Sequence, residues 1–152
     1  MAETQEASTG WNGEVWLSSD DTVANLVELE EVRSFTPDSP TAERVETTTL
    51  KSPNRRRTYT KGMIDSGEAQ IVVNARRGSD TYTALKAALE EGGDRYIRFN
   101  YPELGELVWT DDVLGEVTGI DEGEVAPDSN MEMTITVSVN SVVASAAYVE
   151  PV

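Results

Sequence analysis

The clearest pattern in the chain is an alternation of apolar and polar side chains from Met131 to Asn140. Apolar residues hold every second position: Met131, Met133, Ile135, Val137 and Val139. Polar residues hold the positions between them: Glu132, Thr134, Thr136, Ser138 and Asn140. Because successive side chains of a β-strand point to opposite faces, this pattern predicts a strand with one buried face. The other face is expected to meet water or a polar channel.

Shorter stretches of the same kind predict further strands. They cover residues 14–18, 26–32, 70–74, 95–101, 107–109 and 113–120. Asp20-Asp21 supplies a turn between the first two, which predicts a hairpin. Gly115 and Gly119 lie within the last stretch, where we expect a bulge or a close backbone approach. Polar faces on most strands favour antiparallel pairing.

One helix of about 12 residues is predicted, starting at position 80. We expect it to cover one face of the sheet. Ser79 is placed to cap its N-terminus, and Asp80 favours the positive end of the helix dipole. Tyr82, Leu85 and Leu89 form one apolar stripe. Gly92-Gly93 is expected to end the helix.

These elements predict a mainly β fold: an antiparallel β-sandwich or barrel of six or seven strands, with one flanking α-helix and a long extended loop arm. With 152 residues, the chain is expected to form a single domain, 1–152. The arm spans residues 36–61, where Pro37, Pro40 and Pro53 interrupt any ladder. Loops of this length are usually functional or disordered. The alternatives are a flexible surface loop and an ordered assembly arm anchored by apolar side chains.

The charges are divided between the arm and the ends of the chain. The net charge is −16, yet six of the twelve Lys and Arg residues lie between Arg44 and Lys61. Residues 1–31 hold eight acids and no base, and residues 102–152 hold eleven acids and no base. Complementary patches on one chain favour head-to-tail self-assembly. The predicted inter-subunit contacts are Arg44, Leu50, Lys51, Arg55, Arg56, Arg57, Tyr59 and Lys61.

Two other interpretations of the Arg55–Arg57 triplet remain open: a contact with nucleic-acid phosphates and a solvated run of charge. The acidic balance of the whole chain opposes binding to a phosphate backbone or an anionic membrane. No apolar run is long enough to span a bilayer, and the acidic start lacks a secretory signal. We therefore expect no membrane partner.

Catalysis and metal binding have little support in the sequence. The chain has no Cys and no His, which removes disulfides, thiolate chemistry, imidazole acid–base work and the usual zinc ligand sets. Asp20-Asp21, Asp111-Asp112 and the acids of 121–124 do not match a calcium loop and are interpreted as solvated turns. We expect no catalytic residue, no metal site and no cofactor.

The chain has three tryptophans, Trp11, Trp16 and Trp109. We interpret them as residues that pack in the core or at an interface, and not as a ligand platform.

The order of these segments resembles that of the tail tube (major tail) proteins of long-tailed phages of the lambda type, over about Glu14 to Val143. The resemblance rests on motifs that occur in a fixed order along the chain. They are a Val-x-x-Phe-Thr-Pro turn (Val32, Phe35, Thr36, Pro37), a Glu-x-x-Glu-Thr run (Glu43, Glu46, Thr47), a Gly-Glu strand start (Gly67, Glu68), the helix, and a strand with Tyr96, Arg98 and Phe99. The sequence differs from some relatives in showing no appended immunoglobulin-like domain after the last strand.

The resemblance implies a structural protein without enzymatic activity, which stacks as hexameric rings into a hollow tube of the virion tail. The implied partners are further copies of the chain, the tape measure protein, the tail initiator and the tail terminator, with assembly in the host cytoplasm. Double-stranded DNA is expected to pass through an electronegative lumen without specific binding, because walls of like charge repel phosphates. The lumen-facing candidates are Glu68, Gln70, Glu132, Thr134 and Thr136. The alternatives are a tail terminator, a sheathed-tail tube, or a carbohydrate-binding or hydrolytic β-sandwich.

Overall fold

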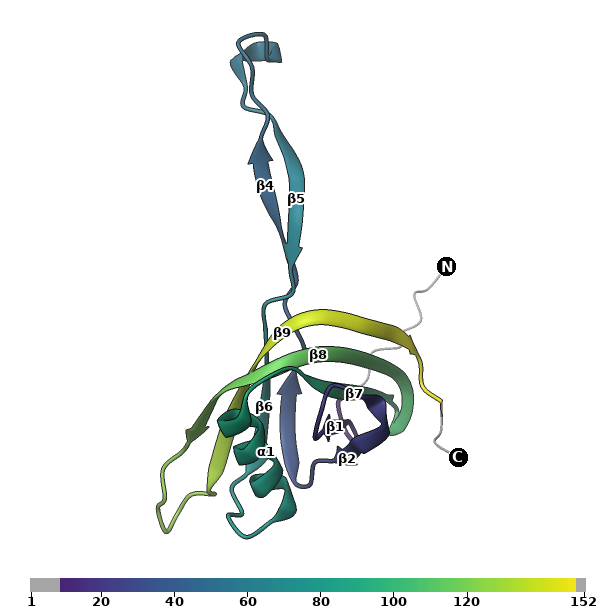
Figure 1. Cartoon of the computed structure of the whole chain (residues 1–152), viewed down its shortest axis with the longest axis vertical. Helices are drawn as coiled ribbons and strands as arrows, with labels where there is room; N and C mark the ends of the chain where they lie inside the picture. Colours follow the sequence, from purple (N-terminus) through teal and green to yellow (C-terminus); the bar gives the residue numbers. More distant parts are fainter. Residues whose placement is uncertain (1–8, 150–152) are drawn as a thin grey trace, which may run out of the picture.

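The computed structural model describes residues 9–149 of the chain, which form a seven-stranded antiparallel sheet, one α-helix and a separate two-stranded hairpin (Figure 1). The mainly β class with one helix is thereby confirmed. The sheet order is β2-β1-β7-β8-β9-β6-β3, and β4 pairs with β5 alone. The elements are β1 (Glu14–Ser18), η1 (Val23–Asn25), β2 (Leu26–Glu28), β3 (Val32–Thr36), β4 (Thr41–Glu46), η2 (Pro53–Arg55), β5 (Tyr59–Asp65), β6 (Glu68–Asn74), α1 (Asp80–Glu91), β7 (Arg95–Glu103), β8 (Glu106–Glu122) and β9 (Glu132–Ala147).

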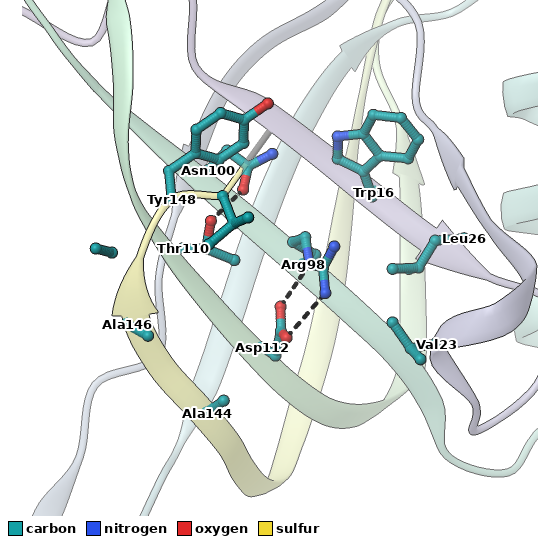
Figure 2. A pocket seen from close by; sticks show the side chains of 12 residues that line it. Trp16, Val23, Leu26, Arg98, Asn100, Thr110, Asp112, Ala144, Ala146 and Tyr148 are labelled. Carbon is teal, nitrogen blue, oxygen red and sulfur yellow. Dashed lines mark hydrogen bonds and ion pairs between the residues drawn. The ribbon is translucent and has the colours of Figure 1, made fainter. Parts of the chain in front are cut away.

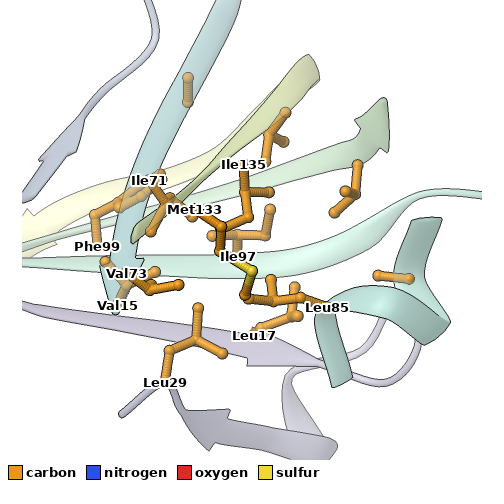
Figure 3. Packing of buried hydrophobic residues seen from close by; sticks show 14 of the residues in the cluster. Val15, Leu17, Leu29, Ile71, Val73, Leu85, Ile97, Phe99, Met133 and Ile135 are labelled. Atoms are coloured by element: carbon orange, nitrogen blue, oxygen red, sulfur yellow. The ribbon is translucent and has the colours of Figure 1, made fainter. Parts of the chain in front are cut away.

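The large sheet curls into an open barrel around one hydrophobic core. The long strands β8 and β9 arch over the body, and they carry the sheet from the β1–β2–β7 wall to the β6–β3 wall (Figure 1). Val15 and Ile97 of the first wall pack in one cluster with Ile71 and Ile135 of β6 and β9 (Figure 3). Because both walls bury their inner faces in this cluster, their outer faces point in opposite directions.

Two glycines allow β8 to run as one strand where the sequence predicts two. The β8–β9 register shifts between Leu114 and Gly115 and again between Val117 and Gly119, which confirms the expected irregularity. A Cβ atom on Gly115 would lie 2.7 Å from a methyl carbon of Val137 and 2.9 Å from the carbonyl oxygen of Ser138. The close backbone approach predicted at Gly115 is therefore present, and it allows the two long strands to bend together.

The predicted helix is confirmed as α1, which has 12 residues. The Ser79 hydroxyl accepts a hydrogen bond from the backbone N–H of Tyr82, at 3.2 Å. Gly92 ends the helix with a φ of 69°, a conformation that favours glycine. Leu85 and Ala88 enter the core, and the helix packs beside β8. Within the described part of the chain, no helix has the length and hydropathy of a membrane span.

The extended arm predicted over residues 36–61 is present, but it is not a loop without strands, because β4 and β5 form an antiparallel hairpin over residues 41–65. The sequence also gave no sign of β3 as a separate strand. Phe35 of β3 stacks on Phe99 with ring centroids 5.2 Å apart and lies 5.6 Å from Tyr101, so tertiary aromatic packing fixes this short strand. The hairpin has no buried face, and the two-residue alternation that marks a half-buried strand is therefore missing from its sequence.

Candidate assembly surfaces

The β4–β5 hairpin, with the turn that joins its strands, projects far from the body (Figure 1). It spans residues 41–65, where the sequence predicted an arm over 36–61, and from here on the arm means residues 41–65. Every residue of β4 is exposed. Val45, Leu50, Met63 and Ile64 are exposed apolar side chains on it. A two-stranded hairpin without a packed face is only marginally stable in water. An arm of this composition is typical of a segment that packs against another molecule.

The cations of the arm differ from those of the body in their partners. Each of the six body cations forms an ion pair: Arg33 with Glu132, Arg76 with Glu31, Arg77 and Lys86 with Glu122, Arg95 with Glu91, and Arg98 with Asp112. Within residues 9–149, no carboxylate lies within ion-pair distance of any arm cation. The guanidinium of Arg44 instead lies over the ring of Tyr59. The arm therefore presents unneutralised positive charge on a strongly acidic protein.

Threonine and serine hydroxyls hold the tip of the arm in place. The backbone N–H of Thr47 donates to the carbonyl of Thr58 at 2.8 Å, and the N–H of Thr58 donates to the hydroxyl of Thr48 at 2.9 Å. The Ser52 hydroxyl accepts from the N–H of Thr49 at 2.8 Å. These bonds continue the hairpin beyond β4 and β5 and explain the Thr-rich sequence of the segment. They place Leu50 at the tip, completely exposed.

All eight predicted contact residues lie on the arm, and all are exposed. The structure brings together Arg44, Tyr59 and Lys61, since Arg44 is the cross-strand partner of Lys61 and its guanidinium covers the Tyr59 ring. The Arg55–Arg57 triplet stands apart from this group, at the tip. Whether these residues touch a neighbouring subunit stays a prediction.

The five lumen candidates share one surface, the outer face of β6 and β9. Gln70 is the direct cross-strand partner of Thr136. The residues that alternate with the candidates, such as Ile71 and Ile135, point into the core. Glu132 is bound by Arg33, a residue that the sequence did not single out. The outer face of these strands is therefore polar, with the charge of one candidate partly neutralised.

Glu14, Glu28 and Glu30 form an acidic patch on the opposite wall. Glu14 lies two positions from Trp16 on β1, and Glu28 is the cross-strand partner of Trp16 on β2. Partial desolvation by the neighbouring protein raises the pKa of Glu28 above its ordinary value, and repulsion from Glu14 and Glu30 raises it further. These carboxylates repel one another in the isolated subunit, so a cation from outside would be favoured there.

The interpretation of Asp111-Asp112 as a solvated turn is wrong. Both residues lie within β8, and Asp112 is buried. The guanidinium of Arg98 donates to both carboxylate oxygens of Asp112, at 2.8 and 3.1 Å, and the Tyr96 hydroxyl donates to one of them. The hydrogen bond to Asp112 raises the pKa of Arg98. Within the described residues, no group of three or more acidic side chains could hold a metal ion.

None of the three tryptophans belongs to the hydrophobic core. Trp11 is exposed beside Gly105, and Trp109 donates through its indole N–H to Asp111 and Ser145. Trp16 is half-buried and lines a cavity on the outer face of β1 (Figure 2). The core part of the earlier interpretation is therefore wrong, while packing at an interface stays a prediction.

Comparison with known proteins identifies relatives of the whole β body. The family model described as lambda phage tail tube protein, TTP, matches residues 11–145. No curated protein sequence matches the chain significantly.

Solved structures share the fold at low sequence identity. The tail of an empty gene transfer agent particle, refined with C6 symmetry, has a TM-score of 0.69 and 16% identity over 94% of this chain and 100% of that one. The SPP1 tail tube has a TM-score of 0.67 and 11% identity over 93% of this chain and 80% of that one. The tube-terminating cap of the anti-feeding prophage has a TM-score of 0.72 and 12% identity over 97% and 96%.

Proposed function

The chain belongs to the lambda phage tail tube protein family, and on that premise we propose that it closes into hexameric rings and stacks them into the hollow tube of a virion tail. The observation that carries the proposal is the family match, which spans nearly all of the described body. The C6 symmetry of the gene transfer agent tail, whose subunit has the same fold, supports six as the number of subunits in a ring.

Open sheet edges support ring closure. The sheet ends at β2 on one side and at β3 on the other. β9 pairs with β6 only as far as Ser138, so its last residues have β8 as their one neighbouring strand within the described part of the chain. Unpaired edges of this kind attract other strands, and a closed ring removes them.

The arm supports stacking between subunits. Its six cations have no carboxylate partner among residues 9–149, whereas the body has a large excess of acids. Contact between the arm of one copy and the acidic surface of another neutralises both charges. It also gives the exposed apolar residues of the arm a surface to pack against.

We assign the outer face of β6 and β9 to the lumen. Glu68 and Glu132 give this face acidic groups, and the net charge of −16 makes the subunit as a whole repel phosphates. Double-stranded DNA would then pass during ejection without specific binding. The further partners in this proposal are the tape measure protein, the tail initiator and the tail terminator, with assembly in the host cytoplasm. No step of this function calls for a cofactor.

Negative-stain electron microscopy of the purified full-length protein tests the central proposal. The expected result is hollow tubes of stacked rings, formed alone or after addition of the tail initiator. Monomers alone, with the initiator present, would contradict it.

A shortened arm tests the role of the hairpin. Glu46 and Tyr59 are cross-strand partners, so an Asn-Gly turn can replace residues 47–58 and close the hairpin there. This variant should fold and fail to stack. Its circular dichroism spectrum should match that of the wild type. Normal stacking of this variant would show that assembly does not require the arm.

Lysines on the proposed lumen wall test its role toward DNA. The double variant Gln70→Lys/Thr136→Lys should form tubes that retain a short DNA duplex in sedimentation, because cations release counterions from phosphates. The control variant, Thr83→Lys/Ala84→Lys, adds the same charge to the exposed face of α1. Equal DNA binding by both variants would reject the lumen assignment.

A tail terminator is the second candidate, favoured by the fold shared with the anti-feeding prophage cap. A terminator forms a single ring, so its products under the same microscope would be isolated rings at every protein concentration. Stacked tubes decide against it.

A further inference from the structure

A cavity of about 330 Å³ lies on the outer face of the wall opposite the proposed lumen (Figure 2). Trp16, Val23 and Leu26 line one side, and Ala144 and Ala146 at the end of β9 line the other. These side chains are apolar, and none of them belongs to the hydrophobic core. The cavity is large enough for an aliphatic side chain from outside.

The polar groups in this cavity already have partners. Arg98 and Asp112 form a two-bond ion pair, and the Thr110 hydroxyl donates to the side-chain oxygen of Asn100 at 2.7 Å (Figure 2). The Trp16 indole N–H donates to Glu14 at 3.1 Å. No buried side-chain nitrogen or oxygen within residues 9–149 lacks a hydrogen bond. An apolar group entering the cavity therefore leaves no polar atom unsatisfied, which favours an apolar occupant.

Two acidic side chains lie next to residues that line the cavity. Glu14 accepts hydrogen bonds from Trp16 and Asn100, two residues that line the cavity. Glu28 is the cross-strand partner of Trp16 in the β1–β2 register, and the nearby charge of Glu14 contributes to the raised pKa of Glu28. The surface therefore fits a ligand with one apolar side chain surrounded by cations.

The tip of the arm has this composition. Leu50 is completely exposed, and Lys51 follows it directly. The Arg55–Arg57 triplet lies in the same turn, and its cations have no carboxylate partner within residues 9–149. The tip lies far from the body of its own chain (Figure 1), so a tip that fills this cavity comes from a second copy.

We propose that the cavity beside Trp16 is the socket for Leu50 of another copy, with the arginine triplet of that copy paired to Glu14 and Glu28. The proposal rests on the proposed tail tube function, and it names the surface that receives the arm. It also places the arm contact on the wall opposite the one assigned to the lumen. Arm docking and DNA passage then use separate surfaces.

A second cavity, of about 520 Å³, is the competing location. It lies between Trp11, Phe35 and Tyr101, and it is larger. None of the described residues that line it is acidic, and Arg33, which lines it, is already paired with Glu132, so a cationic tip would find no carboxylate partner there. Charge complementarity therefore favours the cavity beside Trp16.

Engineered disulfides in the full-length chain test the proposal, because the wild type has no Cys. The variant Leu50→Cys/Ala144→Cys places one thiol on the tip and one in the proposed socket. The variant Leu50→Cys/Ser34→Cys places the second thiol in the competing cavity. After mild oxidation of assembled tubes, the first variant should give a ladder of covalent oligomers on a denaturing gel, and the second should give monomers.

Tubes that cross-link through position 34, or through neither position, would overturn the socket and leave the proposed function standing. A wild-type protein that forms no tubes would instead reject the proposed function, and the socket with it. The two failures are therefore distinguishable.

A charge exchange provides an independent test. Arg56→Glu and Glu28→Arg should each raise the critical concentration for assembly by about tenfold, since each places like charges together. The double variant Arg56→Glu/Glu28→Arg restores opposite charges and should recover most of this loss. A double variant no better than either single variant would overturn the pairing.

Discussion

The guanidinium carbon of Arg44 lies 4.0 Å from the centroid of the Tyr59 ring, across the two strands of the arm. This contact holds a cation over an aromatic face in a hairpin that has no hydrophobic core of its own. A cation–π contact at an exposed site contributes about 0.5–1 kcal/mol. In an isolated hairpin, a contact of this size influences how often the arm is ordered and ready to dock.

Two substitutions of Tyr59 distinguish the contribution of its aromatic ring to assembly from that of its hydroxyl group. Tyr59→Phe keeps the aromatic face and should polymerise like the wild type. Tyr59→Ala removes it and should raise the critical concentration for tube growth about threefold to fivefold, the equivalent of about 0.6–1 kcal/mol. Light scattering over a concentration series measures this value. Equal critical concentrations for the two variants would mean that the Arg44 contact does not support assembly.

Salt should weaken tube growth, because the contacts proposed for the arm join exposed opposite charges. The screening length falls from about 10 Å at 0.1 M salt to about 3 Å at 1 M. We therefore expect the growth rate to fall steeply as sodium chloride is added. A variant with Arg55, Arg56 and Arg57 all changed to Gln should grow slowly at low salt and respond little to further salt. A growth rate independent of salt in the wild type would exclude an electrostatic arm contact.

The body of the fold was readable from sequence wherever one face of an element is buried. The alternation through Met133 and Ile135 marked β9, and Ser79 with Gly92 marked both ends of α1. The arm strands were missed for the converse reason, since a hairpin exposed on both faces leaves no alternation. β3 was missed because its place depends on Phe35 meeting Phe99, two residues far apart in the chain.

The candidate surfaces were predicted to different extents. Residue type alone pointed to the arm cations, and strand periodicity alone placed Gln70 and Thr136 on a polar face. The cavity beside Trp16 had no signal in the sequence, because its lining joins β1 to the end of β9 across the curl of the sheet. The pairing of Arg98 with Asp112 was also invisible, since it depends on the register of β7 with β8.

The close approach at Gly115 should be visible in stability. Gly115→Ala places a methyl group against Val137 and the backbone of Ser138, and it should lower the free energy of unfolding by about 1–3 kcal/mol. Gly119→Ala is the matched control on the same strand, because a Cβ there has no atom within 4 Å. The control should change stability by no more than about 0.5–1 kcal/mol. Urea unfolding followed by tryptophan fluorescence measures both, and an equal loss in the two variants would contradict the crowding at Gly115.

The acidic patch around Glu28 should give the isolated subunit a characteristic pH dependence. The pKa of Glu28 is raised above 4.5 in the folded state, first by partial desolvation and then by the charges of Glu14 and Glu30. Between pH 4.5 and the raised value, the folded state binds more protons at this site than the unfolded state does. The stability contributed by Glu28 is therefore highest below that interval and falls as pH rises through it.

Glu28→Gln should be more stable than the wild type at pH 7, and the difference should shrink as pH falls toward 4.5. Glu124→Gln removes one exposed carboxylate elsewhere and controls for the change in net charge. Urea unfolding at a series of pH values measures the difference, and a Glu28→Gln variant less stable than the wild type at pH 7 would show that the patch is not under electrostatic strain.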